Sequence, residues 1–233
     1  MRQPASAVAL TAPPRVSSVV LLHGLGRTRW SLWPVAREAA RRGYHVHNLG
    51  YPSRRASIEQ LAESIGHRIR AIASEEGPVD VVTHSMGGIV LRAAVAGGAL
   101  PADAVRRVVM LAPPNHGSEL VDRLRDYRVY RFATGPAGQQ IGTSDDSVPR
   151  RLPPPPFEVG IVAGRRSGNP VVARVLGGEN DGKVTVEATR LDGMRDLVVV
   201  DRTHTFIMWA PDVLTQTFAF LETGQFIGGA RDV

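Results

Sequence analysis

The sequence has no cysteine among its 233 residues. This absence excludes a disulfide, a zinc–thiolate site and a cysteine nucleophile, and it leaves the redox state of the compartment undetermined. Lysine is almost absent as well, since Lys183 is the only one. Arginines therefore carry nearly all of the cationic charge behind the formal net charge of +6, and they are scattered in ones and twos.

Aromatic residues are also scarce, at 6% of the chain. A nucleic-acid-binding protein usually gathers its cations on one element and interleaves aromatic side chains that stack on bases. Neither pattern occurs in this sequence. We therefore expect a solvated basic surface and no nucleic-acid partner.

Long apolar runs are missing too. No stretch approaches the roughly 20 apolar residues that a bilayer requires, so we expect no stable membrane insertion. The first residues also lack the apolar segment of a signal peptide. This favours the cytoplasm, and secretion stays open for a chain whose leader has already been removed. The pattern does not indicate an oligomeric state.

The remaining composition is that of a globular protein, with 43% hydrophobic and 21% charged residues. The length suits one layered α/β core. Prolines and small residues dominate the start of the chain. We predict an N-terminal arm over residues 1–15, followed by one domain over residues 16–233.

Apolar runs rich in β-branched residues alternate with segments of helical period along the chain. The pattern predicts strands at residues 17–22, 44–49, 79–83, 106–111, 158–163 and 197–200, and helices at residues 31–42, 57–74, 86–96 and 208–222. Strands joined by helices usually pair in parallel, because parallel neighbours need long crossovers. The expected fold class is α/β, with a mostly parallel sheet and helices on both faces.

Residues 113–156 interrupt this alternation with glycines and prolines. Two short helices are expected there, near residues 117–126 and 136–141. Long excursions from a compact domain are often functional covers. The segment is therefore interpreted as a moving lid or as a fixed loop layer, and the sequence does not separate the two.

The strongest motif is the sequence Thr83-His84-Ser85-Met86-Gly87-Gly88. It follows a buried strand and opens a helix, which is where open α/β sheets meet their ligands. A serine on such a sharp turn exposes its hydroxyl as a nucleophile, and small residues must surround it. Thr83 stands where the Gly-x-Ser-x-Gly pattern has glycine. The alternative role for Ser85 is that of a helix N-cap without chemistry.

Together with the earlier His23-Gly24-Leu25-Gly26, this motif resembles the small bacterial lipases and esterases of the α/β-hydrolase superfamily. The resemblance extends over nearly the whole chain and implies the α/β-hydrolase fold. It also implies that the backbone N–H groups of Leu25 and Met86 form the oxyanion hole. Two fixed N–H donors stabilise the charge that develops when an ester carbonyl is attacked.

A serine hydroxyl needs a neighbouring base, and in this fold the acid and then the base follow the nucleophile in the chain. His116 and His204 are the candidates after Ser85 and its neighbour. His204 is preferred, because it comes directly after the last predicted strand. His116 is interpreted as a residue of the site rim or of the structure.

The stretch Asn180-Asp181-Gly182-Lys183-Val184 resembles the Asn-Asp-Gly-x-Val element that carries the acid in this family. The resemblance assigns the orienting carboxylate to Asp181, although Asn-Asp-Gly is also favourable turn chemistry. The competing acids are Glu179, Asp192, Asp196 and Asp201.

These residues predict an esterase or lipase that cleaves a small-molecule or lipid ester through an acyl-enzyme on Ser85. No metal or cofactor is expected. A thioesterase, amidase or acyltransferase with the same triad is the alternative, and a non-catalytic binding protein that kept the fold is a more distant one. The aromatic and apolar side chains considered as walls for the acyl chain, although each is more often a plain core residue, are Trp30, Trp33, Met86, Tyr127, Tyr130, Phe132, Ile207 and Met208.

Overall fold

A computed structural model of the chain describes residues 17–228, and the predicted N-terminal arm at residues 1–15 lies outside this range. Six strands form one sheet: β1 (Ser18–Leu22), β2 (His45–Leu49), β3 (Val79–His84), β4 (Val105–Leu111), β5 (Glu158–Gly164) and β6 (Asp196–Val200). Their spatial order is β2-β1-β3-β4-β5-β6, and every pairing is parallel. The predicted parallel sheet is confirmed.

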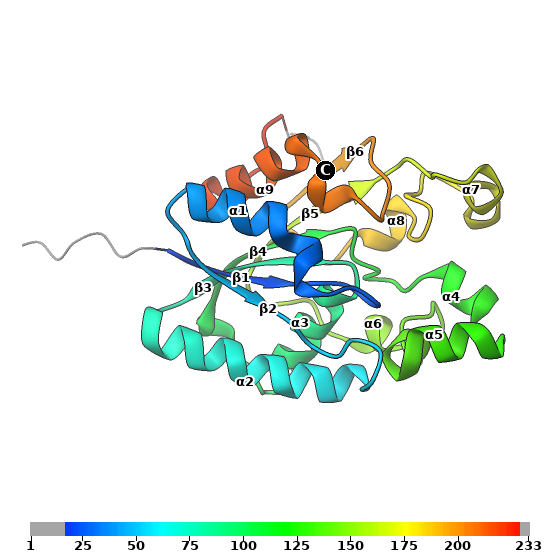
Figure 1. The fold of residues 1–233 in the computed structure, drawn as a ribbon, viewed down its shortest axis with the longest axis horizontal. Helices are drawn as coiled ribbons and strands as arrows, with labels where there is room; N and C mark the ends of the chain where they lie inside the picture. Colours follow the sequence, from blue (N-terminus) through cyan, green and yellow to red (C-terminus); the bar gives the residue numbers. More distant parts are fainter. Residues whose placement is uncertain (1–16, 229–233) are drawn as a thin grey trace, which may run out of the picture.

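Helices cover both faces of this sheet (Figure 1). They are α1 (Trp33–Arg41), α2 (Ile58–Glu76), α3 (Met86–Ala96), α4 (Glu119–Leu124), α5 (Arg128–Gln139), α6 (Val148–Arg151), α7 (Pro170–Leu176), α8 (Val186–Thr189) and α9 (Pro211–Thr223). Three short 3₁₀ segments add η1 (Arg29–Leu32), η2 (Ala102–Ala104) and η3 (Ile207–Trp209). No helix within residues 17–228 is both long and apolar enough to cross a membrane.

The core is divided by the sheet into two halves. Because side chains alternate along a strand, Val20 and Leu22 pack with α2 and α3 on one face. Val19 and Leu21 of the same strand pack with α1 and α9 on the other face. In Figure 1, α1 and α9 lie above the sheet and α2 and α3 lie below it. The continuous apolar runs of the strands thus reflect burial on both faces.

Helix α2 illustrates how local sequence fixes an element. Ser57 caps its start and forms a reciprocal capping box with Gln60. The residues that the 3.6-residue period aligns on one face, including Leu61, Ile65 and Ile69, are buried. The helix ends at Gly77, whose φ of 89° favours glycine.

The excursion over residues 113–156 differs in part from the prediction. Helix α4 falls within the predicted residues 117–126, but α5 begins at Arg128, well before the predicted 136–141. Gly135 breaks α5 at φ 64°, and Pro136 follows it, so only the second part overlaps the prediction. A Cβ at Gly135 would lie 1.8 Å from the carbonyl oxygen of Arg54, so this break also lets the excursion pack closely.

The sheet topology creates a switch point beside β1. The chain leaves β1 to form β2 on one side and returns to form β3 on the other. The loops that follow β1 and β3 therefore diverge and leave a crevice between them. Leu22 is paired with Thr83 in the register, so the two motifs that follow these residues lie side by side at the carboxyl edge.

Candidate active site

Ser85 occupies a strained turn between β3 and α3. Its φ of 54° and ψ of −127° lie in a region that residues with a Cβ rarely adopt. The backbone N–H of Ser85 donates to the carbonyl of Leu111 at the end of β4, at 2.8 Å. The residue is 9% exposed. The turn therefore presents the hydroxyl at the edge of the sheet, as the sequence predicts for this motif.

Glycines allow the close packing around this turn. A Cβ on Gly87 would lie 2.6 Å from the carbonyl oxygen of Leu22, so α3 approaches β1 too closely for any side chain there. A Cβ on Gly24 would lie 3.0 Å from the Cβ of Ser85. Thr83, the departure from the family pattern, is fully buried, and its hydroxyl faces Gly88. The absence of a side chain at Gly88 makes room for it.

The structure brings Ser85, His204 and Asp181 together. The Nε2 of His204 lies 3.0 Å from the Oγ of Ser85. The Nδ1 of His204 lies 2.7 Å from the Oδ2 of Asp181. Both Asp181 and His204 are almost fully buried. With its Nδ1–H donating to the carboxylate, His204 presents the lone pair of Nε2 to the hydroxyl.

Hydrogen bonds hold the carboxylate in place. The Oδ1 of Asp181 accepts the backbone N–H groups of Lys183 at 2.9 Å and Val184 at 2.8 Å. The neighbouring Asn180 is buried, and its side-chain amide donates to three carbonyls, those of Ala173, Gly177 and Gly178. The backbone N–H of His204 also donates to the carbonyl of Asp181 at 3.0 Å. The Asn-Asp-Gly segment thus forms a turn and also holds the carboxylate of Asp181 in place.

His84 supports the loop that carries His204. Its Nε2 lies 3.1 Å from the carbonyl oxygen of His204 and therefore carries the proton. Burial, together with the charge that His204 carries when protonated, holds the pKa of His84 well below its usual value of 6.5. A neutral His84 adds no positive charge against a protonated His204. His84 is part of the sequence motif around Ser85, but the motif does not predict this contact.

His23 shapes the loop that contains Leu25. Its Nδ1 lies 2.9 Å from the carbonyl of Gly24, and its ring stacks on Tyr51 with the centroids 4.1 Å apart. The hydroxyl of Tyr51 donates to the carbonyl of His23. Burial lowers the pKa of His23, although the hydrogen bond of its ring to the carbonyl of Gly24 opposes the shift. These contacts fix the backbone of the loop beside Ser85.

A cavity of about 220 Å³ opens above Ser85 and His204. Leu25, Gly26, Lys183 and Val184 line part of it. The excursion supplies the remaining apolar walls from α4, α5 and the segment after them, through Leu120, Val121, Tyr130, Ala133 and Ile141. The excursion therefore covers the site.

The side chains considered as walls for the acyl chain are divided among the core, the surface and the cavity. Of that set, only Tyr130 lines the cavity. Met86, Ile207 and Met208 are fully buried in the two cores, and the exposed aromatic side chains are those of Trp30, Trp33, Tyr127 and Phe132. Apolar side chains on the excursion carry no periodic signal that separates the cavity face from the solvent face. The sequence therefore did not identify the walls that the excursion supplies.

Lys183 lies at the rim of this cavity and is exposed to solvent. The residues around its amine partly exclude water from it, and this desolvation lowers the pKa of the amine. The charge of the nearby Arg27 lowers it further. Ser118 is buried beside it and donates its hydroxyl to the carbonyl of Lys183 at 2.8 Å. Neither residue was singled out for the site from the sequence.

The competing residues lie elsewhere. His116 lines an adjacent cavity of about 370 Å³ and not the one above Ser85. Glu179 and Asp201 both pair with Arg165. Asp196 accepts the backbone N–H groups of Leu197 and Phe226.

Several solved structures of other proteins have a fold similar to that of this chain. The mature lipase BlEst2 of Bacillus licheniformis superposes with a TM-score of 0.72, at 22% identity over 93% of this chain and 95% of the lipase. The metagenomic carboxyl esterase MGS0156 gives 0.63 at 21% identity, over 85% of this chain and 68% of the esterase. Lipase B of Aspergillus fumigatus gives a TM-score of 0.63 at 14% identity, over 89% of this chain and 52% of the lipase. These likenesses confirm the predicted α/β-hydrolase fold.

Sequence comparison adds a family. A comparison with curated proteins finds no match. Residues 14–139 match the profile of a family described as "Domain of unknown function (DUF7379)". This segment contains both the loop at Leu25 and the turn at Ser85, and it spans more than half of the chain. The chain therefore belongs to the DUF7379 family and has the α/β-hydrolase fold.

Proposed function

We propose that this protein is a serine hydrolase that cleaves carboxylic esters through an acyl-enzyme on Ser85. One observation carries the proposal: an unbroken series of hydrogen bonds joins Ser85, His204 and Asp181 at the floor of a cavity. The esterases and lipases that share the fold are consistent with this chemistry.

In the first step, the Oγ of Ser85 attacks the ester carbonyl while the Nε2 of His204 takes its proton. Asp181 orients the imidazole and stabilises its positive charge. The proton then passes to the departing alcohol, which leaves the acyl group on Ser85. Water, activated by the same imidazole, releases the acid in the second half of the cycle.

The backbone N–H groups of Leu25 and Met86 are assigned the role of stabilising the negative charge that develops on the carbonyl oxygen. Met86 is the first residue of α3, and the first N–H groups of a helix have no partner within it. The positive end of the helix dipole adds to the stabilisation. Leu25 lines the cavity beside Ser85, which supports its share of the role.

The cavity also bears on the substrate. Its volume of about 220 Å³ is below the roughly 300–1,000 Å³ of sites for larger ligands. We therefore expect p-nitrophenyl butyrate to be cleaved with a higher kcat/KM than the palmitate ester. If the covering excursion moves as a lid, activity on emulsified triglyceride rises at the lipid interface, and a flat response contradicts a lid.

Labelling with a fluorophosphonate tests the nucleophile directly. Mass spectrometry should locate the adduct on Ser85, and Ser85→Ala should abolish both labelling and ester turnover. Ser74→Ala, on the exposed face of α2, is the matched control and should behave as the wild type. An adduct on Ser118, the other serine that lines the cavity, or full turnover by Ser85→Ala would refute the proposal.

The alternative is a thioesterase, amidase or acyltransferase that uses the same three residues. Acyl-enzyme formation is common to all of them, so labelling does not separate them. A panel of oxygen esters, thioesters and amides, each with and without an added alcohol acceptor, does. Transfer to the alcohol in preference to water would favour the acyltransferase.

A further inference from the structure

Two histidines and a glutamate converge at the edge of the sheet opposite to Ser85. His45 begins β2, and Glu76 is the last residue of α2. The strands are parallel, and Ser85 follows the carboxyl end of β3. The cluster therefore lies at the amino-terminal edge of the sheet and is independent of the proposed catalytic site.

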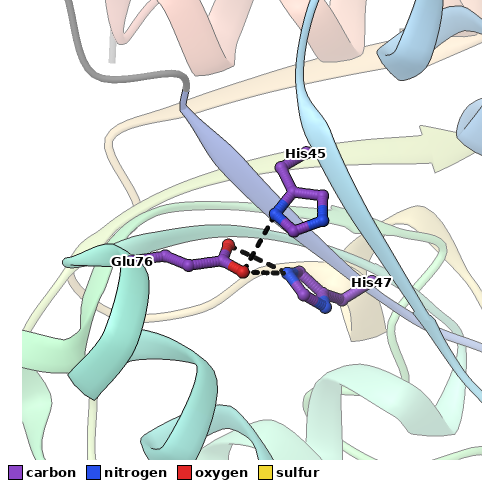
Figure 2. A group of neighbouring side chains, drawn as sticks. All are labelled: His45, His47 and Glu76. Carbon is purple, nitrogen blue, oxygen red and sulfur yellow. Dashed lines mark hydrogen bonds and ion pairs between the residues drawn. The ribbon is translucent and has the colours of Figure 1, made fainter.

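The three side chains point toward one another (Figure 2). The Nδ1 of His45 lies 2.9 Å from the Oε1 of Glu76. The Nε2 of His47 lies 2.9 Å from Oε2 and 3.1 Å from Oε1. Alternation along β2 places both imidazoles on the same face of the strand, and one donor atom from each residue lies within 4.8 Å of the other two.

This donor set and its spacing match those of a transition-metal site. Zinc is bound by imidazole nitrogens and carboxylate oxygens at about 2.0–2.2 Å with tetrahedral geometry, in which neighbouring ligand atoms are about 3.3 Å apart. The separations of both imidazole nitrogens from Oε1 of Glu76, 2.9 and 3.1 Å, are close to this value, and the two nitrogens lie within 4.8 Å of each other, so small side-chain rotations would admit an ion. Within residues 17–228 it is the only group of three or more such side chains with this geometry.

A hydroxyl group holds the carboxylate of Glu76 in place. Ser18 donates its hydroxyl to Oε2 and thereby orients the group, as outer partners of metal ligands commonly do.

Solvent access leaves room for a fourth ligand. The side chain of His45 is 59% exposed, whereas those of His47 and Glu76 are about one fifth exposed. Water can therefore complete the coordination from the side of His45. The cluster would also connect three elements, because Ser18 belongs to β1, the histidines to β2 and Glu76 to α2.

We propose that His45, His47 and Glu76 bind one divalent transition-metal ion, for which zinc is the best match, and that this ion ties the edge strand β2 to the end of α2. Mg²⁺ should not bind measurably, because it prefers an all-oxygen octahedral set. The ion stabilises the fold and takes no part in ester cleavage.

The experiment uses the full-length chain without a histidine tag, after removal of metals with a chelator. Calorimetric titration with zinc chloride should give one ion per chain. At a zinc concentration 100-fold above Kd, Tm should rise by roughly 5–10 °C. Mg²⁺ should leave Tm unchanged, and a change in Tm does not depend on the chain being an esterase.

Variants locate the site. His47→Gln and Glu76→Gln should each weaken zinc binding by at least about 10-fold and remove most of the rise in Tm. His67→Gln, an exposed histidine on α2, is the matched control and should bind zinc as the wild type does. Circular dichroism verifies that each variant is folded. The proposal is overturned if the wild type binds no zinc, or if folded His47→Gln and Glu76→Gln bind it with unchanged affinity.

Discussion

The strained backbone at Ser85 predicts that two variants without its hydroxyl differ in stability. At φ 54° and ψ −127°, a residue with a Cβ costs about 1–3 kcal/mol, and glycine avoids this cost. Glycine loses about 0.5–1 kcal/mol more conformational freedom than alanine on folding. We therefore expect Ser85→Gly to be more stable than Ser85→Ala by about 1 kcal/mol, or roughly 2–4 °C in Tm.

Urea unfolding measures this difference, provided that the two variants unfold with the same slope m. Both variants lack the hydroxyl, so we expect both to lack ester turnover, and the comparison isolates the backbone from the chemistry. Ala71→Gly, on the exposed side of α2, is the matched control. There glycine relieves no strain, and we expect it to lower the free energy of unfolding by about 1 kcal/mol.

The reasoning is refuted if Ser85→Ala is as stable as Ser85→Gly while Ala71→Gly shows its expected loss. In that case, the turn would store no strain at residue 85. The sharpness of the turn would then have to come from the packing of α3 against β1 alone.

Three further predictions concern residues around the same turn. Asp181→Asn should lower kcat/KM for a p-nitrophenyl ester by about 10⁴-fold, because the amide favours the wrong tautomer of His204; a loss below 10-fold would contradict the assigned role. Gly87→Ala should lower the free energy of unfolding by about 1–3 kcal/mol, because the added Cβ meets the carbonyl of Leu22 at 2.6 Å, and an unchanged urea midpoint would show that α3 can shift. Because the pKa of His84 is lowered in the folded state, its contribution to stability is present above its usual value of 6.5 and is lost as pH falls below it. His84→Gln should therefore unfold with a smaller pH dependence between about pH 7 and pH 5, and an equal dependence would contradict the shift.

Much of the fold could be predicted because its signals are local. The apolar run at residues 79–83 and the helix that starts at Met86 are set by neighbouring residues, and the structure agrees with both. The parallel pairing of the strands was predicted from the alternation of strands and helices. Helix α7 was not predicted, since its valines favour strands. It begins because Asn169 caps it and Pro170 follows at the first position.

The candidate site divides in the same way. Ser85, Asp181 and His204 were predicted from motifs and from their order in the chain, and they converge in space. The support from His84 depends on a contact with the carbonyl of His204, 120 residues away in the chain, which no local pattern reveals. Similarly, Glu76 is 29 residues from His47 in the chain, so the proposed metal site becomes visible only when α2 is packed beside β2.

The solitary lysine has a practical consequence. Acylating reagents react with the uncharged form of an amine, and the lowered pKa of Lys183 increases the fraction of its amine in that form. Apart from the terminal amine, Lys183 is therefore the only amine that such a reagent meets in this chain, and it stands at the mouth of the cavity. Attachment to a resin through amines would obstruct the entrance, whereas a small fluorophore coupled there would report when the entrance is occupied.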